Sequence, residues 1–470
     1  DSVPTHPKEP FLFSICRDSN DLKIIRLERL FIMTNQITDN EINADGHLQI
    51  DGCDAIELAH QYGTPLMVYN VSSIRDQFHQ FNKIFEQNNI DYEISYASKA
   101  FANTAMYQLV NQEGGHIDVV SGGEIAVALH AGFPAAKMSF HGNNKSLEEL
   151  RLAIQNHIGV IMVDNFHEIE LINQVVEELD TTVNVIMRIT PGITAHTHEF
   201  IQTGQVDSKF GFDLESGQVE SGFELLHKNP RVHILGFHAH IGSQISSPDG
   251  FNALAVKMMQ LANKFNTEYD FTTEVLDLGG GFGIQYVSTD GYLAPEKFVE
   301  SIINTIKGQA NEYNLPIPAI WIEPGRSIVG SAGLTLYTVG SQKRVNGIKP
   351  YVAVDGGMGD NIRPMLYDAE YEVVSANNPR AENVEEVRLV GKYCESGDVL
   401  IKNASVPSLQ AGDIVAVLDT GAYGYSMASN YNLNLKPAIV FVENGKAQLV
   451  TKRQSFENLY ELDNSLELGD

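Results

Sequence analysis

Cysteine is scarce in this chain: the 470 residues include only Cys16, Cys53 and Cys394. These three lie at unrelated spacings, which fit neither a disulfide framework nor the paired cysteines of a zinc or redox site. Chains without such frameworks are typical of reducing compartments. We therefore expect a cytoplasmic protein.

Basic residues are outnumbered, with 32 Lys and Arg against 60 Asp and Glu, for a formal net charge of −28. This charge repels nucleic-acid phosphates and anionic membrane surfaces, so we expect neither as a partner. Any phosphate that the protein binds needs a local cradle. Apolar runs of the roughly 18 to 20 residues that span a membrane are missing as well. With 43% hydrophobic and 20% charged residues, the composition is that of a globular chain long enough for two domains.

Residues 1–32 differ from the smoother stretch that Met33 opens. Their apolar pieces, "FLFSIC" and "LFIM", are separated by charges, so they make neither a convincing signal peptide nor an anchor. We expect residues 1–32 to be an extension whose removal leaves activity intact.

From residue 71 the sequence alternates between helical periodicity and short apolar runs. The first helix is indicated by Ile74, Phe78, Phe81 and Phe85, which recur at spacings of three or four residues. Eight β-rich runs follow, with helical segments such as 146–157 and 295–313 between most of them. The eight predicted strands are 93–97, 117–121, 138–142, 159–164, 183–189, 234–241, 275–281 and 319–325.

Eight strands that alternate with helices over about 250 residues are typical of a (β/α)8 barrel, and a doubly wound sheet is the alternative. After about residue 330 the helical period fades, and short alternating runs separated by Gly, Asn and Asp indicate an all-β domain. We predict the barrel at 71–329 and the β domain at 330–470. Residues 33–70 are strand-rich ("HLQIDG", "PLMVYN") and are expected to pair with the β domain.

Polar and glycine residues follow nearly every predicted barrel strand, at the end where barrel enzymes place their chemistry. These residues favour a site for a polar ligand at that rim. They are Lys99, Asp118, His141, Asp164, Arg188, His240, Gly279 to Gly281, Glu323 and Arg326.

The run "LDLGGGFGI" is not a dinucleotide fingerprint, because Ile284 stands where the last glycine belongs, and no P-loop lysine follows. Three glycines in a row would let backbone N–H groups close on an anion, although a tight turn without a ligand explains them equally well. His238 and His240 share one face of a strand, but no third ligand has metal-like spacing, so we expect no metal site. A hydrogen-bonding or stacking role stays open for His240.

Lys99 and Glu323 are the charged residues with the clearest chemical meaning. Lys99 in "SYASKAF" is either a surface lysine or a Schiff-base lysine whose pKa desolvation lowers. Glu323 ends an apolar strand, so its carboxylate needs a cationic partner, and a protonated pyridine nitrogen would supply one.

Eight motifs, in order and spacing from about residue 40 to the end, resemble the pyridoxal-phosphate-dependent diaminopimelate decarboxylases. They are "YASKA", "HGNNKS", "GFHAHIGSQ", "LDLGGGFG", "EPGRSIV", "IRPMLYDA", "CESGD" and "GAYGYSMASNYN". "YASKA", "GGGFG" and "EPGR" are shared with related ornithine, arginine and carboxynorspermidine decarboxylases, so they imply the cofactor alone. "HGNNKS", "RPMLYDA" and "CESGD" are similar to the diaminopimelate branch. The implied fold is an alanine-racemase-like (β/α)8 barrel that binds pyridoxal phosphate, with a C-terminal β-sandwich or β-barrel domain.

The resemblance implies a role for each matching position. Lys99 would hold the cofactor covalently, His240 would stack on its ring, and Glu323 would pair with the ring nitrogen. The remaining implied cofactor positions are Asp118, Ser243, Gly279, Gly280, Gly281, Pro324, Gly325, Arg326 and Tyr423. The positions implied to bind the substrate are Arg326, Arg363, Tyr367, Glu395 and Tyr423, with Glu395 holding the distal ammonium.

Cys394 lies beside the acids of "CESGD", which should make its thiol a poor nucleophile. The resemblance implies that this loop completes the active site of a second subunit, so the enzyme would be a homodimer. Neighbouring carboxylates favour the protonated thiol, and such a thiol is suited to return a proton to the carbon that lost carbon dioxide. The implied reaction converts meso-2,6-diaminopimelate to L-lysine and carbon dioxide, the last step of lysine biosynthesis.

Two alternatives remain from the sequence. The same chemistry could act on carboxynorspermidine or ornithine, although an arginine pair selective for a second carboxylate argues against a simple diamine precursor. A barrel that binds the cofactor without turnover is the other, and the presence of both Lys99 and Cys394 argues against it. A racemase would need a second base, and the "CESGD" motif does not favour one.

Overall fold

The computed structural model describes residues 38–193 and 208–467. The predicted extension at 1–32 lies outside these residues. In the parts of the chain that the structure describes, no helix is long and apolar enough to cross a membrane.

Eight parallel strands form a closed barrel. Their order is β10-β11-β12-β4-β5-β6-β7-β8, and a pairing of β8 with β10 closes the ring, which confirms the predicted (β/α)8 barrel. A short strand, β9 (Phe212–Asp213), continues beside β8. The barrel strands are β4 (Tyr92–Ala97), β5 (His116–Val119), β6 (Met138–Phe140), β7 (Val160–Val163), β8 (Val183–Thr190), β10 (Val232–His238), β11 (Val275–Asp277) and β12 (Ala319–Ile322).

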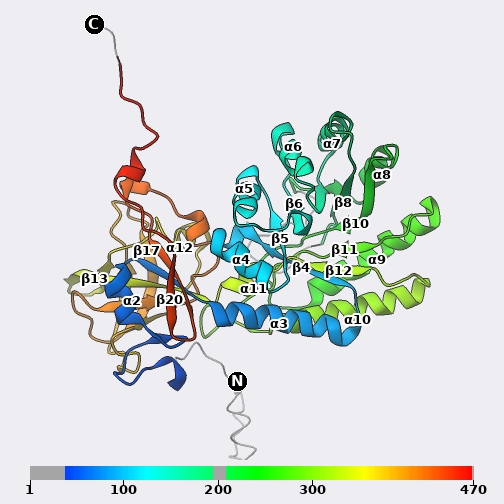
Figure 1. Ribbon diagram of the computed structural model, residues 1–470. Coiled ribbons are helices and arrows are strands. Elements are labelled where there is room, and N and C mark those ends of the chain that lie inside the picture. Colours follow the sequence, from blue (N-terminus) through cyan, green and yellow to red (C-terminus); the bar gives the residue numbers. More distant parts are fainter. Residues whose placement is uncertain (1–37, 194–207, 468–470) are drawn as a thin grey trace, which may run out of the picture. The chain divides into compact units, whose positions relative to one another are not determined.

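Helices surround the barrel strands (Figure 1). The first, α3, buries Ile74, Phe78, Phe81 and Phe85 completely, as its periodicity predicts. Each of these side chains contributes about 1.5 to 3 kcal/mol when removed from water. The barrel helices are α3 (Val71–Asn88), α4 (Thr104–Gln112), α5 (Gly122–His130), α6 (Leu147–Gln155), α7 (Phe166–Glu178), α8 (Gln218–His227), α9 (Asp249–Tyr269) and α10 (Pro295–Tyr313).

The C-terminal part is a β domain with strand order β17-β16-β14-β13-β3-β19-β20, in which β18 pairs with both β13 and β15. Two short helices, α11 (Arg326–Val329) and α12 (Arg363–Tyr367), lie before and within it. Its strands are β13 (Gly333–Val345), β14 (Ile348–Val354), β15 (Val373–Ser375), β16 (Glu385–Val390), β17 (Val399–Val406), β18 (Ile414–Val417), β19 (Ala438–Glu443) and β20 (Lys446–Thr451).

The segment before the barrel divides between two sheets. Strand β3 (Leu66–Asn70), from "PLMVYN", lies between β13 and β19 and so belongs to the sheet of the β domain. "HLQIDG" forms strand β1 (Gln49–Ile50), which pairs with β2 (Cys53–Asp54) rather than with that sheet. Helix α2 (Ala55–Tyr62) follows, and the apolar side chains of this segment pack with β3 in one cluster. The domain limits drawn from the sequence stay a prediction.

A segment of the β domain contacts the barrel where the carboxyl ends of the strands meet. The Tyr423 N–H donates to the carbonyl of Ala100, just after β4, over 2.8 Å. Tyr423 has a φ of 59°, a conformation that a bulky residue adopts only when its surroundings enforce it. This contact places Tyr423 at the barrel rim, beside the residues that follow the strands.

Candidate active site

A cavity of about 430 Å³ opens at the carboxyl ends of the barrel strands. Residues from the barrel and from the β domain line it together. The lining residues that the sequence predicted are Lys99, His240, Ser243, Gly281, Glu323, Gly325, Arg326, Arg363, Tyr367 and Tyr423. Other lining residues include Gln244, Tyr286, Asp290, Asp368, Ala369, Glu370 and Met427, which the sequence did not single out.

Lys99 is presented to this cavity by a single turn of 3₁₀ helix, Ser98–Ala100, directly after β4. Desolvation lowers the pKa of its amine, but Asp118, Tyr423 and Glu323 outweigh desolvation, so the pKa is raised. The prediction of a lowered pKa is therefore wrong for the free protein: desolvation acts in the predicted direction, but the neighbouring groups outweigh it. The amine enters the site as an ammonium group.

Asp118 supplies the largest part of this effect from the neighbouring strand, β5, where its backbone pairs with Ala97. Its side chain is almost completely buried, and burial raises the pKa of its carboxyl, with Glu323 adding to the rise. Lys99 and His141 act in the opposite direction. Asp118 is not among the residues that line the cavity, so it acts on Lys99 from the neighbouring strand and not from the cavity itself.

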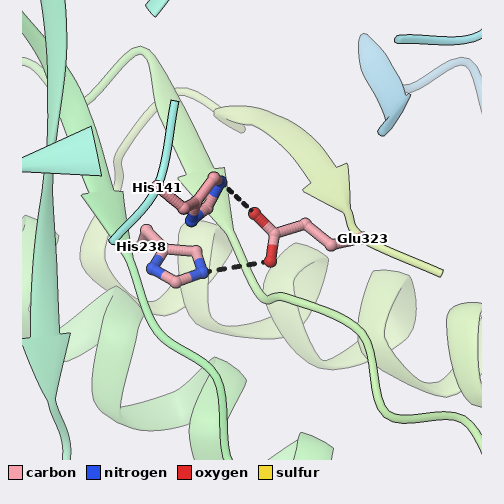
Figure 2. A group of neighbouring side chains, drawn as sticks. All are labelled: His141, His238 and Glu323. Atoms are coloured by element: carbon pink, nitrogen blue, oxygen red, sulfur yellow. Dashed lines mark hydrogen bonds and ion pairs between the residues drawn. The ribbon is translucent and has the colours of Figure 1, made fainter. Parts of the chain in front are cut away.

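Glu323 follows β12 and contacts two histidines, His141 and His238 (Figure 2). One carboxylate oxygen lies 2.8 Å from Nε2 of His141, and the other lies 3.3 Å from Nε2 of His238. Burial alone would raise the pKa of Glu323, but the two histidines hold it well below its usual value. A buried carboxylate that stays ionised, and that also lines the cavity, can receive a cationic group of a ligand.

The ligand atoms of His141, His238 and Glu323 lie within 4.8 Å of one another, which is close enough to consider a metal ion. Hydrogen bonding and ion pairing between the rings and the carboxylate account for this grouping without one. His240, which shares a strand face with His238 in the sequence, is not part of this group. His240 instead accepts the N–H of Gly280 through Nδ1 over 3.3 Å and lines the cavity.

The glycine run after β11 packs so closely against neighbouring backbone that two of its positions have no room for a side chain. A Cβ on Gly280 would lie 1.9 Å from the carbonyl oxygen of Glu323, and one on Gly281 would lie 2.1 Å from that of Gly242. The N–H of Gly279 already donates to Asp277 over 2.8 Å, and that of Gly280 to His240. Of the three glycines, Gly281 alone lines the cavity. A tight turn therefore explains Gly279 and Gly280, and an anion cradle remains open for Gly281.

Arg326 has the features of an anion-binding group. Its side chain is buried, its Nη2 donates to Ser243 Oγ over 3.0 Å, and its Nε is buried without a hydrogen-bond partner. The guanidinium also lies 4.9 Å from the centre of the Tyr423 ring. An orphaned donor beside a serine, Gly281 and a tyrosine fits the phosphate group of a cofactor.

Arg363, at the start of α12, is the second buried arginine of the cavity. Its Nη1 donates to the phenol oxygens of Tyr286 and Tyr371 over 3.0 and 2.6 Å. Burial raises the pKa of Tyr371 to about 12, so this phenol stays neutral beside the cation. Tyr286 was missed from the sequence, where its only signal is an aromatic residue shortly after the glycine run.

Cys394 and Glu395 are exposed on the loop between β16 and β17, and neither lines the cavity of its own chain. The loop is nevertheless held in place. The buried Asp398 carboxylate accepts the N–H groups of Met358 and Tyr393 over 2.7 and 2.9 Å. The Cys394 N–H donates to the side chain of Asn432 over 2.8 Å.

The fold and the site define the class of protein to which this chain belongs. The model of the family described as "Pyridoxal-dependent decarboxylase, pyridoxal binding domain" matches residues 71–330, which include the whole barrel. The lysine, the ionised carboxylate and the orphaned arginine fit pyridoxal phosphate, which is the cofactor of this class.

Comparison with known proteins identifies the family of this chain within the class. The diaminopimelate decarboxylase of Bacillus subtilis is 51% identical over 427 residues, which cover 91% of this chain and 97% of the relative. A crystal structure of diaminopimelate decarboxylase from M. jannaschii has a TM-score of 0.84 and 34% identity, covering 91% of this chain and 98% of that one. A complex of that enzyme with L-lysine has a TM-score of 0.83, again with 34% identity, over 90% and 97% of the two chains. The chain belongs to the diaminopimelate decarboxylase family, as its sequence motifs predicted.

Proposed function

We propose that the protein removes carbon dioxide from meso-2,6-diaminopimelate, at the carbon of D configuration, and releases L-lysine. The observation that carries this proposal is that Lys99, Glu323 and two buried arginines, Arg326 and Arg363, line one cavity. An amine can hold the cofactor, a carboxylate can pair with its ring, and the cations can bind the phosphate and a carboxylate of the substrate.

Pyridoxal phosphate, when bound, supplies a protonated pyridine ring that withdraws electrons from the reacting carbon. Lys99, which lines the cavity, would hold the cofactor through its amine. Glu323 would receive the ring nitrogen, and its lowered pKa favours the negative charge that this contact requires. His240, which also lines the cavity, would stack on the ring. Asp118 favours the charged form of the free Lys99 amine.

The phosphate is assigned to Ser243, Gly281, Arg326 and Tyr423, which line the cavity together. Gly279, Gly280, Pro324 and Gly325 shape the backbone around this position. The carbonyl of Pro324 accepts the N–H of Ala97 over 3.2 Å, which ties the "EPGR" turn to the strand that leads to Lys99.

Arg363 and Tyr367 are assigned to the substrate carboxylate that is not removed, with Arg326 and Tyr423 at the boundary between cofactor and substrate. A guanidinium binds a planar carboxylate through two parallel hydrogen bonds, which a substrate without a second carboxylate cannot form. This requirement favours diaminopimelate over ornithine.

We infer that Cys394 and Glu395 act in the cavity of a second copy of the chain, within a homodimer. Both side chains are exposed and lie outside the cavity of their own chain, while the backbone that carries them is fixed. In this role Glu395 binds the distal ammonium of the substrate. The Cys394 thiol gives its proton to the carbon that lost carbon dioxide, and the resulting thiolate takes a proton from solvent. The cytoplasmic location stays a prediction.

A substrate panel tests the proposal. The purified chain is supplied with pyridoxal phosphate and, in separate reactions, with meso-diaminopimelate, carboxynorspermidine or ornithine. We expect L-lysine and carbon dioxide in equal amounts from meso-diaminopimelate and at least about a hundredfold lower kcat/KM for ornithine, because its side chain offers no second carboxylate to the cavity. Faster turnover of either control would assign the protein to the neighbouring chemistry. Cofactor binding without turnover of any of them would indicate a non-catalytic barrel.

A further inference from the structure

The carboxylate of Glu323 contacts two histidines that come from other strands of the barrel. His141 follows β6 and His238 ends β10, whereas Glu323 follows β12, and none of these three strands pairs with another of the three. The contacts therefore cross the inside of the barrel, with both rings turned toward the carboxylate (Figure 2). The two rings meet edge to face, with centroids 5.1 Å apart. One carboxylate oxygen has a hydrogen bond to His238, and the other lies at ion-pair distance from His141.

His238 can serve only as a neutral donor. It is 1% exposed, and burial lowers its pKa to about 4, with help from Arg188 and His141. Its Nδ1 is buried without a partner, while its Nε2 faces Glu323 over 3.3 Å. A neutral ring that carries its one proton on Nε2 satisfies the carboxylate, and this tautomer leaves an acceptor, not a donor, at the unpartnered nitrogen.

Other buried carboxyl groups lie near Glu323, so the two histidine contacts affect which of these groups is ionised. Asp277 on β11 and Asp118 on β5 are buried carboxyls close to Glu323, and burial raises the pKa of both, with Glu323 adding to each rise. Glu323 is the member of this group whose pKa is lowered, and the two histidines are the cause. Glu323 is therefore the carboxyl of this group that most readily keeps its negative charge.

We propose that His141 and His238 are positioning residues that orient the Glu323 carboxylate toward the cavity and keep it ionised for the cofactor ring nitrogen. This inference rests on the proposed function, because it assumes that Glu323 receives that nitrogen. Loss of the His238 N–H would leave one oxygen of a buried carboxylate without its hydrogen bond, and loss of the His141 ring would remove the ion-pair contact of the other oxygen. Either loss weakens the negative charge that the ring nitrogen requires.

Matched substitutions separate the N–H from the bulk of the ring. Glutamine places an amide N–H near the position of histidine Nε2, whereas asparagine is polar but ends short of it. The variants are His141→Gln, His141→Asn, His238→Gln and His238→Asn. The control pair is His116→Gln and His116→Asn, because His116 contacts Glu93 on β4 over 2.9 Å and is not among the residues that line the cavity.

The measurement is equilibrium binding of two compounds to each cofactor-free protein. One is pyridoxal phosphate, and the other is its 1-deaza analogue, in which a carbon replaces the ring nitrogen. Phosphate binding and attachment to Lys99 are common to both, so the ratio of the two affinities isolates the contact of the ring nitrogen with Glu323. Melting temperatures identify any variant that does not fold, and the two histidine positions provide independent comparisons.

We expect the wild-type protein and both control variants to prefer pyridoxal phosphate by the same factor. The asparagine variants at 141 and 238 should lose about tenfold of this preference, the scale of one hydrogen bond to a charged group, and the glutamine variants should regain most of it. Unchanged ratios in the asparagine variants would overturn the proposal, as would equal losses for asparagine and glutamine, which would indicate a packing role. No preference in the wild-type protein, together with no effect of Glu323→Gln, would instead refute the assignment of Glu323 and the inference with it.

Discussion

Arg326 and Arg363 donate to the same phenol oxygen, that of Tyr286. One arginine lies at the end of the barrel, in α11, and the other in α12 of the β domain. Tyr286 therefore sets the spacing between the group assigned to the cofactor phosphate and the group assigned to the substrate carboxylate. The two cations also lie 5.6 and 5.0 Å from the centre of its ring, which offsets part of their mutual repulsion.

Replacing this phenol tests the coupling of the two arginines. Tyr286→Phe keeps the ring and removes the shared acceptor, so we expect KM for meso-diaminopimelate to rise about tenfold, the scale of lost hydrogen bonds to charged donors. Steady-state kinetics with saturating cofactor measure the change. Tyr351→Phe is the matched control, because Tyr351 accepts a hydrogen bond from Arg388 elsewhere in the β domain. Equal effects of the two substitutions would show that Tyr286 has no special role.

Mixing two inactive variants tests whether active sites are shared between subunits. Lys99→Ala and Cys394→Ala should each lack activity. In a mixed dimer, one cavity would combine Lys99 of one chain with Cys394 of the other and would be intact. Random reassociation makes half of the dimers mixed, with one intact site of two, so we expect about a quarter of wild-type activity.

The activity after dissociation and reassociation of an equal mixture is the quantity to measure. Each variant treated alone is the control. If Cys394 served the cavity of its own chain, every cavity in the mixture would lack either Lys99 or Cys394. The mixture would then stay inactive.

Asp398 should act on the reaction through the loop that carries Cys394. Asp398→Asn can accept only one of the two N–H groups, those of Met358 and Tyr393, and leaves the other unsatisfied. We expect kcat to fall about tenfold while affinity for the cofactor is retained, because the cavity itself is untouched. Asp413→Asn is the control, since Asp413 accepts the N–H of Gln410 in an exposed turn. A parallel loss of cofactor binding in Asp398→Asn would contradict a role confined to the loop.

Asp360 should make stability depend on pH. Burial raises the pKa of this carboxyl to about 7 in the folded protein, despite hydrogen bonds from Tyr337 and the N–H of Gly357. The unfolded chain loses the proton near pH 4, so between about pH 4 and pH 7 the folded state binds more protons, and its stability falls as pH rises. Ionised Asp360 then costs stability above about pH 7.

Asp360→Asn removes this titration. We expect the melting temperature of the variant to fall less between pH 5 and pH 8 than that of the wild-type protein. Over the same range, the loss in free energy of unfolding should be smaller for the variant by an amount on the order of a few kcal/mol. Asp91→Asn, at an exposed position, should leave the pH dependence unchanged. Equal slopes for the wild-type protein and Asp360→Asn would show that Asp360 is ionised in both states.

Much of this architecture could be predicted because it is encoded locally. The period of Ile74, Phe78, Phe81 and Phe85 defines α3, and the short apolar runs define the barrel strands. The carboxyl ends of barrel strands share one rim. The sequence therefore places Lys99, His240 and Glu323 together, and all three line the cavity. The position of each residue directly after a predicted barrel strand was sufficient for this prediction.

The remaining features depend on how distant strands meet. The contacts of His141 and His238 with Glu323 arise from closure of the barrel, which no local pattern encodes. The raised pKa of Lys99 has the same origin, because Asp118 reaches it through the pairing of two strands. Tyr286 was missed because its importance lies in two arginines that are distant in sequence.

The most direct measurement is formation of L-lysine and carbon dioxide from meso-diaminopimelate by the wild-type protein and by Lys99→Ala, each supplied with pyridoxal phosphate. Lys137→Ala is the control, because Lys137 is a partly exposed lysine that is not among the residues lining the cavity. We expect one molecule of each product per substrate from the wild-type and control proteins and none from Lys99→Ala. Lysine formation that survives the loss of Lys99, or no lysine from the wild-type protein, would contradict the proposed function.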